Sequence, residues 1–337
     1  TRRGDGVRRP GAGRRVPGAV TGLLDVPRVR LGTLPTPLHP APALSAKLGV
    51  EIWFKRDDLT GFGLGGNKVR GLEYLLGDAE RQGCDVLVTA GGPQSNWAML
   101  AALAARTRGL DSVLVSFGDP VDPVGNHALA VLAGAEVRFT GDPDRASADA
   151  GVDAVCDELR AAGRCPYGVH RGGATGVGAL GYVAAALELA GQIHESGRHP
   201  RELWLATGSC GTHAGLVAGQ AWLRPSHTVV GVTVSRPAAE CRERVARIAA
   251  EAAAMIGTPL PDREPTVVDG FLGPAKGSRS ADGDEAARLV ARLEGVFLDP
   301  VFAAKAMAGL VAACRAGTVT GPVVFLVSGG APTLFTV

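Results

Sequence analysis

A lysine that directly follows a glycine-rich loop is the residue of this sequence best placed for covalent chemistry. The segment Leu59-Thr-Gly-Phe-Gly-Leu-Gly-Gly-Asn-Lys68-Val-Arg70 holds four glycines within six residues, so its backbone can approach a ligand closely. A strand-like run precedes it and a helix-like run follows, which puts Lys68 in the first turn of that helix. The helix dipole there opposes a cation and predicts a lowered pKa and a nucleophilic amine. A solvated lysine beside a flexible turn is the other interpretation of these residues alone.

A second glycine-rich turn, Leu205-Ala-Thr-Gly-Ser-Cys-Gly-Thr-His-Ala-Gly215, separates a predicted strand from a predicted helix. Free amides at the helix start and the hydroxyls of Ser209 and Thr212 would point at one spot, which suits a phosphate. The turn lacks the Gly-Lys-Ser/Thr of a nucleoside-triphosphate loop, which argues against that ligand. An ordinary tight turn between a strand and a helix would have the same composition.

Three polar residues, Gln94, Ser95 and Asn96, stand where another predicted helix begins. Their amides and hydroxyl are suited to hold a carboxylate or a ring oxygen. Alternatively, Ser95 or Asn96 only caps the helix.

These turns, together with Ser328-Gly329-Gly330 near the C-terminus, suggest one ligand with a phosphate at one end and an aldehyde at the other. Pyridoxal phosphate fits, because it needs a lysine for a Schiff base, a phosphate site and a group near its ring nitrogen. The run Gly61 to Gly66 also matches GxGxxG formally. A charged run separates it from the preceding strand, so a dinucleotide-dependent oxidoreductase is the weaker interpretation.

Strand-like and helix-like runs alternate along the chain, which predicts layers of parallel α/β units with ligands at the carboxyl ends of the strands. We predict strands at 51–55, 86–89, 112–117, 136–139, 167–170, 202–206, 228–234 and 323–327. We predict helices at 40–48, 69–82, 97–106, 126–133, 144–162, 178–196, 213–223, 240–255, 284–294 and 302–316.

The composition is that of a globular chain of 337 residues, 46% hydrophobic and 20% charged, with a net charge of +2. Nothing in it indicates a nucleic-acid or membrane partner. Six scattered cysteines show no metal-ligand spacing, so we expect no metal and reduced thiols in a cytoplasmic protein. Residues 1–24 read as a disordered basic leader.

Five motifs together resemble the 1-aminocyclopropane-1-carboxylate deaminase/D-cysteine desulfhydrase family, from about Val29 to the C-terminus. They are Gly65-Gly-Asn-Lys68-Val-Arg70, Thr89-Ala-Gly-Gly-Pro-Gln-Ser-Asn96, Gly208-Ser-Cys-Gly-Thr-His-Ala-Gly215, Leu298-Asp-Pro-Val301 and Ser328-Gly-Gly-Ala-Pro-Thr-Leu-Phe335. The resemblance implies an α/β fold of the tryptophan-synthase-β type (fold type II), with two three-layer α/β/α domains. Residues 25–59 plus 171–337 would form the large cofactor-binding domain and residues 60–170 the small one. It also implies a homodimer.

The resemblance also implies the roles of individual residues. Lys68 would bind pyridoxal phosphate and act as the base, Asn96 would bond the ring oxygen, and Ser95 with Gln94 would hold the substrate carboxylate. The phosphate would lie against Ser209, Cys210, Gly211 and Thr212. Ser328 replaces the threonine that the family usually places near the ring nitrogen.

Two positions depart from the family pattern, which has tyrosines at both. Gly273-Pro-Ala-Lys276-Gly277 lacks the first tyrosine, and Phe302 replaces the second. Phe302 has no hydroxyl, so opening of a cyclopropane ring is not expected, although Phe302 still belongs to the predicted substrate site. Lys276 is a surface lysine, a contact for an anionic group on the substrate, or a second base; with Lys68 and Ser95 it completes the predicted catalytic set.

These observations predict a pyridoxal-phosphate-dependent lyase that acts on an amino acid, in the manner of D-cysteine desulfhydrase. It would remove the α-proton, expel a β-substituent and give pyruvate and ammonia. The alternatives are β-substitution or racemisation on the same scaffold, 1-aminocyclopropane-1-carboxylate deamination, and a catalytically silent protein that binds the cofactor.

Overall fold

The computed structural model describes residues 22–260, 263–274 and 277–335. The part of the predicted leader before residue 22 lies outside this range. Residues 22–24 do not continue a disordered leader, because a short 3-10 helix, η1 (Leu23–Asp25), begins there. Leu23 is buried in a hydrophobic cluster with residues of later helices, so the ordered chain starts earlier than we predicted.

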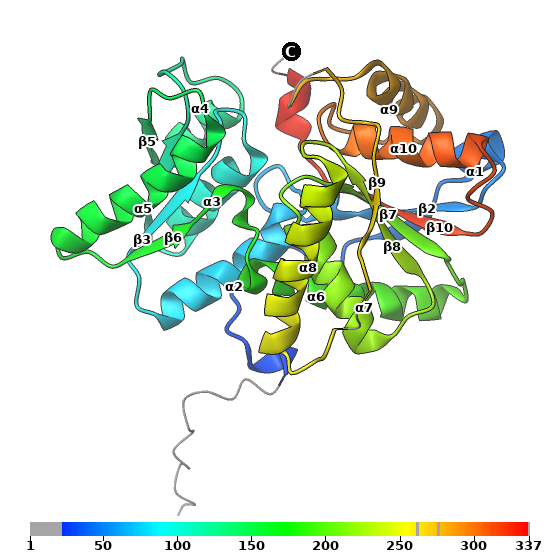
Figure 1. Ribbon diagram of the computed structural model, residues 1–337, viewed down its shortest axis with the longest axis horizontal. Helices are drawn as coiled ribbons and strands as arrows, with labels where there is room; N and C mark the ends of the chain where they lie inside the picture. The colour runs from blue at the N-terminus through cyan, green and yellow to red at the C-terminus, as the bar shows by residue number, and fades with distance from the viewer. Residues whose placement is uncertain (1–21, 261–262, 275–276, 336–337) are drawn as a thin grey trace, which may run out of the picture.

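The protein has two lobes, each built on its own sheet (Figure 1). The larger sheet has six strands in the order β1-β2-β10-β7-β8-β9, parallel except for the β1–β2 pair. Its strands are β1 (Leu38–Pro40), β2 (Ile52–Arg56), β7 (Glu202–Thr207), β8 (Thr228–Thr233), β9 (Thr266–Val268) and β10 (Val323–Val327). The short strands β1 and β9 escaped prediction, because three residues carry no period.

The smaller sheet has four parallel strands in the order β5-β4-β3-β6. They are β3 (Val86–Ala90), β4 (Asp111–Ser116), β5 (Glu136–Phe139) and β6 (Pro166–Val169). Helices α3 (Asn96–Thr107) and α4 (Asn126–Leu132) cover one face, and α5 (Arg145–Ala161) covers the other. This lobe therefore has the three layers that we expected.

The large sheet is also buried on both faces, because its strands alternate between two apolar clusters. In β10, Val323, Phe325 and Val327 join one cluster, and Val324 and Leu326 join the other. The first cluster packs under α1 (Pro42–Leu48), α9 (Ala281–Glu294) and α10 (Ala303–Arg315). The second packs under α6 (Gly176–Ser196) and α7 (Gly211–Leu223), and α8 (Ala238–Met255) packs on these two helices.

Helix α2 (Lys68–Arg81) connects the lobes, since it packs against α3 of the small lobe and α6 of the large one. Glycines allow the close approach to α6: a Cβ on Gly181 would lie 2.3 Å from the carbonyl oxygen of Arg70. The predicted domain boundaries near residues 60 and 170 flank this connection and stay a prediction.

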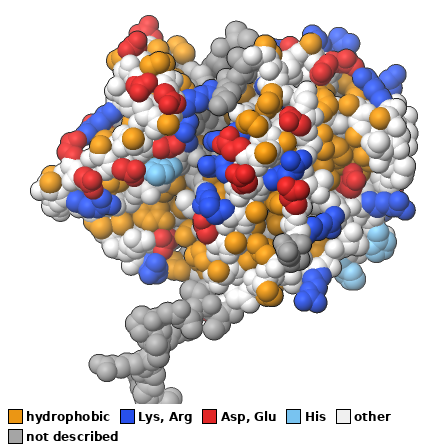
Figure 2. Space-filling view, viewed as in Figure 1, with side chains coloured by type: hydrophobic (Ala, Val, Ile, Leu, Met, Phe, Trp, Pro, Cys, Tyr) orange, Lys and Arg blue, Asp and Glu red, His pale blue; other side chains and the backbone are white. Residues whose placement is uncertain are grey.

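One of the described helices, α6, is long and apolar enough to cross a membrane. It packs against α2, α7 and α8 in the large lobe, as the core helix of a globular protein does. On the face drawn in Figure 2, charged side chains of both signs are interspersed, in keeping with the small net charge.

Candidate active site

A cavity of about 160 Å³ lies at the carboxyl ends of strands from both sheets. Its walls come from the glycine loop before α2 and from the turns that follow β3, β6, β7 and β10. Parallel α/β sheets place their ligands at this end. The polar and aromatic side chains that line it are Asn67, Lys68, Gln94, Ser95, Asn96, Trp97, Ser209, Cys210, Thr212, His213, Phe302 and Ser328.

Lys68 is the first residue of α2 and points its amine into this cavity. Its Nζ donates to Ser209 Oγ at 3.1 Å and to the Gly172 carbonyl oxygen at 3.5 Å. Burial lowers the pKa of Lys68 to about 8. The lowered pKa agrees with our prediction, but its main cause is loss of solvent rather than the helix dipole that we invoked.

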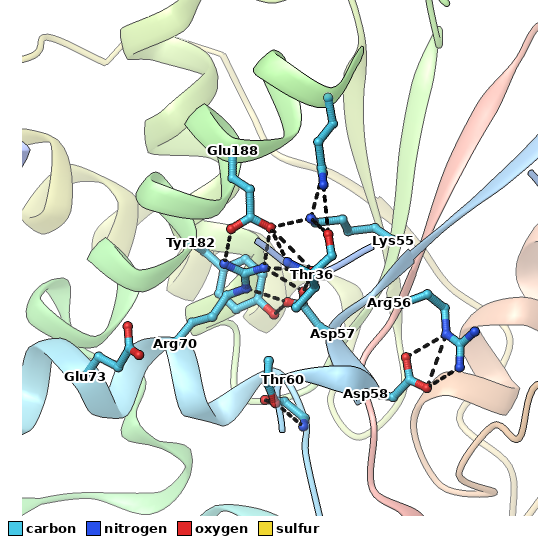
Figure 3. A network of polar contacts seen from close by, with 12 residues as sticks. Thr36, Lys55, Arg56, Asp57, Asp58, Thr60, Arg70, Glu73, Tyr182 and Glu188 are labelled. Carbon is cyan, nitrogen blue, oxygen red and sulfur yellow. Dashed lines mark hydrogen bonds and ion pairs between the residues drawn. The ribbon is translucent and has the colours of Figure 1, made fainter. Parts of the chain in front are cut away.

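A buried polar network anchors the glycine loop that carries Lys68 (Figure 3). Asp57, fully buried in the 3-10 helix η2 (Asp57–Leu59), accepts two bonds of 2.8 Å from Arg70 on α2. Arg70 also bonds Glu188 on α6 at 2.8 and 3.0 Å. The backbone of Asp57 then accepts from the amide of Gly66 at 3.1 Å. The charged run before the loop is therefore an internal support and not the solvated hinge that the sequence suggests.

The predicted phosphate site is the N-terminus of α7. The helix starts at Gly211, two residues before our prediction, so the amides of Gly211 and Thr212 belong to its first turn and have no acceptor within the helix. Cys210 precedes them in a left-handed conformation (φ 78°). The hydroxyl of Thr212 is held by Asn67 Nδ2 at 3.0 Å. Gly211 borders a smaller void that Lys68 also lines.

The turn after β3 brings Gln94, Ser95 and Asn96 to the cavity. Ser95 caps α3, because its hydroxyl accepts from the amide of Ala98 at 3.2 Å. Gln94 is bound on both sides of its amide, to the Val124 carbonyl oxygen and the Asn126 amide. Only a part of each predicted substrate contact is therefore available to a ligand.

Asn96 and Ser328 face each other across the cavity. Asn96 Oδ1 accepts from Asn126 Nδ2 at 2.7 Å, which leaves its own NH2 toward Gly330: a Cβ there would lie 2.8 Å from Asn96 Nδ2. Ser328 follows β10, and its carbonyl oxygen accepts from the amide of Asn67 at 2.9 Å. This bond ties the end of β10 to the lysine loop.

Phe302 lines the cavity, whereas Lys276 lies outside the described residues. All three tyrosines of the chain are described, and none of them lines this cavity. Tyr182 bonds Asp57, Tyr167 bonds Asp78, and Tyr74 stacks with Arg28. No tyrosine hydroxyl is thus available for the role that the family assigns to the missing residues.

The residues present fit pyridoxal phosphate. A buried amine with a lowered pKa stands opposite a helix N-terminus that offers free amides and the Ser209 hydroxyl. In the cavity wall, the buried His213 leaves its Nε2 without a hydrogen-bond partner. Close approach is built in at Gly172, where a Cβ would lie 2.5 Å from Ser209 Cβ.

Comparison with known proteins agrees with this arrangement. Residues 29–329 match the family model described as pyridoxal-phosphate dependent enzyme. The chain belongs to this family. It is an enzyme family whose cofactor is pyridoxal phosphate, as the residues around Lys68 predicted.

Relatives within the family are similar along nearly the whole chain. A D-cysteine desulfhydrase of Yersinia pestis is 40% identical over 325 residues, 93% of this chain and 96% of the relative. A putative 1-aminocyclopropane-1-carboxylate deaminase of Pyrococcus abyssi is 38% identical over 309 residues, 92% of this chain and 93% of the relative. The predicted resemblance to these two kinds of protein is confirmed.

Solved structures confirm the predicted fold type II. The crystal structure of a homologue of 1-aminocyclopropane-1-carboxylate deaminase superposes with a TM-score of 0.87 at 36% identity, covering 93% of this chain and 95% of the other. The crystal structure of a bacterial-type threonine deaminase shares the fold at a TM-score of 0.65 and 21% identity, covering 88% of this chain and 92% of its own.

Sequence reasoning missed several residues of the site. Asn67 holds the Thr212 hydroxyl, and its place directly before Lys68 was the available signal. Trp97 and His213 line the cavity next to predicted positions. Asp57 and Glu188 support the loop from distant segments, and nothing in the linear sequence pairs them.

Proposed function

We propose that this protein is a pyridoxal-phosphate-dependent lyase that removes the α-proton of an amino acid and eliminates its β-substituent, releasing pyruvate and ammonia. The observation that carries the proposal is the placement of Lys68, whose amine has a pKa of about 8 inside a cavity with an anion site opposite. The similarity to D-cysteine desulfhydrases over nearly the whole chain supports elimination.

In this proposal Ser209, Cys210, Gly211 and Thr212 hold the phosphate, Asn96 bonds the ring oxygen and Ser328 meets the ring nitrogen. Bound in this way, pyridoxal phosphate supplies a ring that withdraws electrons from the α-carbon. Ser95 orients the substrate carboxylate through its backbone and hydroxyl, and Gln94 positions that turn through its bonds to the 124–126 loop.

Lys68 holds the cofactor and, once the amino acid has replaced it there, takes the α-proton. The electron pair of the Cα–H bond forms a Cα–Cβ double bond, and the Cβ–substituent bond breaks with its electron pair on the leaving group. Addition of water then gives pyruvate and ammonia. A neutral amine is required for the proton transfer, and the burial of Lys68 provides it near neutral pH.

The first test is the visible spectrum of the purified protein before and after borohydride, beside Lys68→Ala. We expect an absorption band that borohydride removes and that the variant lacks. A protein that takes up no pyridoxal phosphate would contradict the proposal. Pyruvate release from a panel of D- and L-amino acids then separates elimination from β-substitution, which needs a second nucleophile, from racemisation, and from silent binding.

Deamination of 1-aminocyclopropane-1-carboxylate is the second candidate, because a relative from Pyrococcus abyssi carries that name. The cavity argues against it, since Phe302 lines the wall and no tyrosine does. We expect no ammonia from this substrate under conditions in which a β-substituted amino acid gives pyruvate. Ammonia release at a comparable rate would reverse this choice.

We further propose that the protein is a cytoplasmic homodimer without nucleic-acid or membrane partners. All six cysteines are free thiols, which suits a reducing compartment. Sedimentation equilibrium tests the dimer, and a mass of one chain would contradict it. Lys276 stays a candidate contact for the substrate, and an unchanged substrate preference in Lys276→Met would remove it.

A further inference from the structure

A wider outer cavity of about 640 Å³ continues from the site toward the surface. It shares Gln94, Ser95, Gly172, Ser209 and Phe302 with the inner cavity, among other residues. The junction is close to the reacting centre, because Lys68 Nζ lies 3.1 Å from Ser209 Oγ and 3.5 Å from the carbonyl oxygen of Gly172. A substituent on the substrate can therefore extend from the inner cavity into the outer one.

Arginines line this outer cavity. Arg145, Arg171, Arg236 and Arg279 contribute to its walls, and among the described residues no aspartate or glutamate does. The four arginines come from different segments, so the fold alone brings them together. Figure 2 shows Lys and Arg side chains with acidic ones beside them in the middle of its face, between the two lobes.

The arginines nearest the junction are held in place from behind. Arg171 binds Asp149 at 2.8 Å through Nε and at 2.9 Å through its own amide. Arg236 donates from Nε to the carbonyl oxygen of Gly208 at 3.1 Å and pairs with Glu240. Neither carboxylate lines the cavity.

Arg145, at the start of α5, is placed by the ring of Phe117, whose centroid lies 5.5 Å from its guanidinium carbon. Burial and the positive charges of Arg171 and Arg236 lower the pKa of Arg145, so these three guanidinium groups repel one another. An anion among them would relieve the repulsion and gain short, charge-assisted hydrogen bonds.

We propose that the outer cavity binds an anionic substituent on the β-side of the amino-acid substrate (a carboxylate, sulfonate or phosphate), with Arg145, Arg171 and Arg236 as its specificity determinants. The inference rests on the proposed function and names its substrate class. The α-carboxylate stays at the Ser95 turn, and the second anion lies toward the arginines.

The test compares amino acids of similar shape that differ in charge, as both enantiomers: aspartate with asparagine, and O-phosphoserine with O-acetylserine. Dissociation constants are measured on the holoenzyme from the change in its visible absorption, and KM and kcat for pyruvate release are measured separately. Arg145→Gln removes the charge, Arg145→Lys keeps it, and Arg160→Gln is the control, an exposed arginine on the same helix that pairs with Asp157.

We expect the wild-type holoenzyme to bind the anionic member of at least one pair more tightly than its neutral partner. Arg145→Gln should weaken the anionic ligand about tenfold or more and leave the neutral one unchanged, because a hydrogen bond to a charged group is lost. Arg145→Lys should retain much of the preference, and Arg160→Gln all of it.

Equal binding of charged and neutral partners by the wild type would overturn the inference. So would equal weakening of both partners in Arg145→Gln, since the arginines would then serve the α-carboxylate that all amino acids share. Pyruvate release from neutral substrates without any preference would refute the anion site and leave the lyase proposal intact. Selective binding of the anionic partner without pyruvate from any substrate would support the anion site and refute elimination.

Discussion

At the scale of single residues, Lys68 depends on its surroundings for its reactivity. An exposed lysine is almost fully protonated at neutral pH, since its pKa is about 10.4. Inside the cavity, burial lowers this value to about 8, and the amine bonds only to the Ser209 hydroxyl and a carbonyl oxygen. The neutral, nucleophilic form is therefore accessible at physiological pH.

The rate at which the apoenzyme captures pyridoxal phosphate should report this pKa. Because the folded-state pKa is lowered, the neutral amine appears as pH rises through about 8, and the rate should then level off. Stopped-flow absorption from pH 6 to 10 measures it, with Nα-acetyl-lysine as the reference for an unburied amine. A protein rate that keeps rising in parallel with the reference above pH 9 would contradict the role of burial.

Gly65 should be essential for the lysine loop because of contact rather than backbone conformation alone. Its φ is +72°, and a Cβ there would lie 2.0 Å from the carbonyl oxygen of Asp58. Gly83 has a φ of +71° with nothing within 4 Å, so it is a matched control. We expect Gly65→Ala to lose about 1–3 kcal/mol more unfolding free energy than Gly83→Ala, measured by urea denaturation. Equal losses would mean that the loop shifts freely.

At the scale of elements, the start of each helix determines which groups reach the cavity. The N-terminus of α7 offers its amides because the helix begins at Gly211. Helix α10 begins directly after Phe302, and Asp299 accepts the amides of Val301, Phe302 and Ala303 at 2.7 to 3.1 Å. Asp299 is fully buried, and burial raises its pKa to about 6.

Asp299→Ala should lower the unfolding free energy by about 1–2 kcal/mol at pH 7.5, because three amides at the start of α10 lose their acceptor. Urea denaturation of the apoenzyme measures the change. Asp122→Ala, an exposed aspartate in a loop, is the control and should have no effect. If both variants are equally stable, Asp299 does not anchor the helix that carries Phe302 to the cavity.

At the scale of the whole molecule, the site exists only where the two lobes meet. Helix α2 brings the lysine loop, the small lobe brings Ser95 and Asn96, and the large lobe brings the α7 N-terminus and Ser328. The network of Asp57, Arg70, Tyr182 and Glu188 fastens α2 to α6 below this junction (Figure 3).

Arg70→Leu should destabilise the apoenzyme by about 3–5 kcal/mol, because it leaves the buried carboxylate of Asp57 without its cationic partner. Arg81→Leu removes an exposed ion pair with Asp78 on the same helix and should cost less than about 1 kcal/mol. Denaturation midpoints of both variants provide the measurement. Similar small losses would show that the network contributes no more than a surface pair.

The sequence by itself determined the local chemistry. Glycine loops, helix starts and apolar runs depend on neighbouring residues, so Lys68, the Ser209–Thr212 turn and the alternating elements could be predicted, with β5 and β10 at their observed ends. Only the tertiary structure decided what lies far apart in the chain. It buried Asp57 against Arg70, placed all three tyrosines away from the site, and gathered Arg145, Arg171 and Arg236 at one cavity. Such contacts arise from the packing of two lobes around α2, and no periodicity along the chain records them.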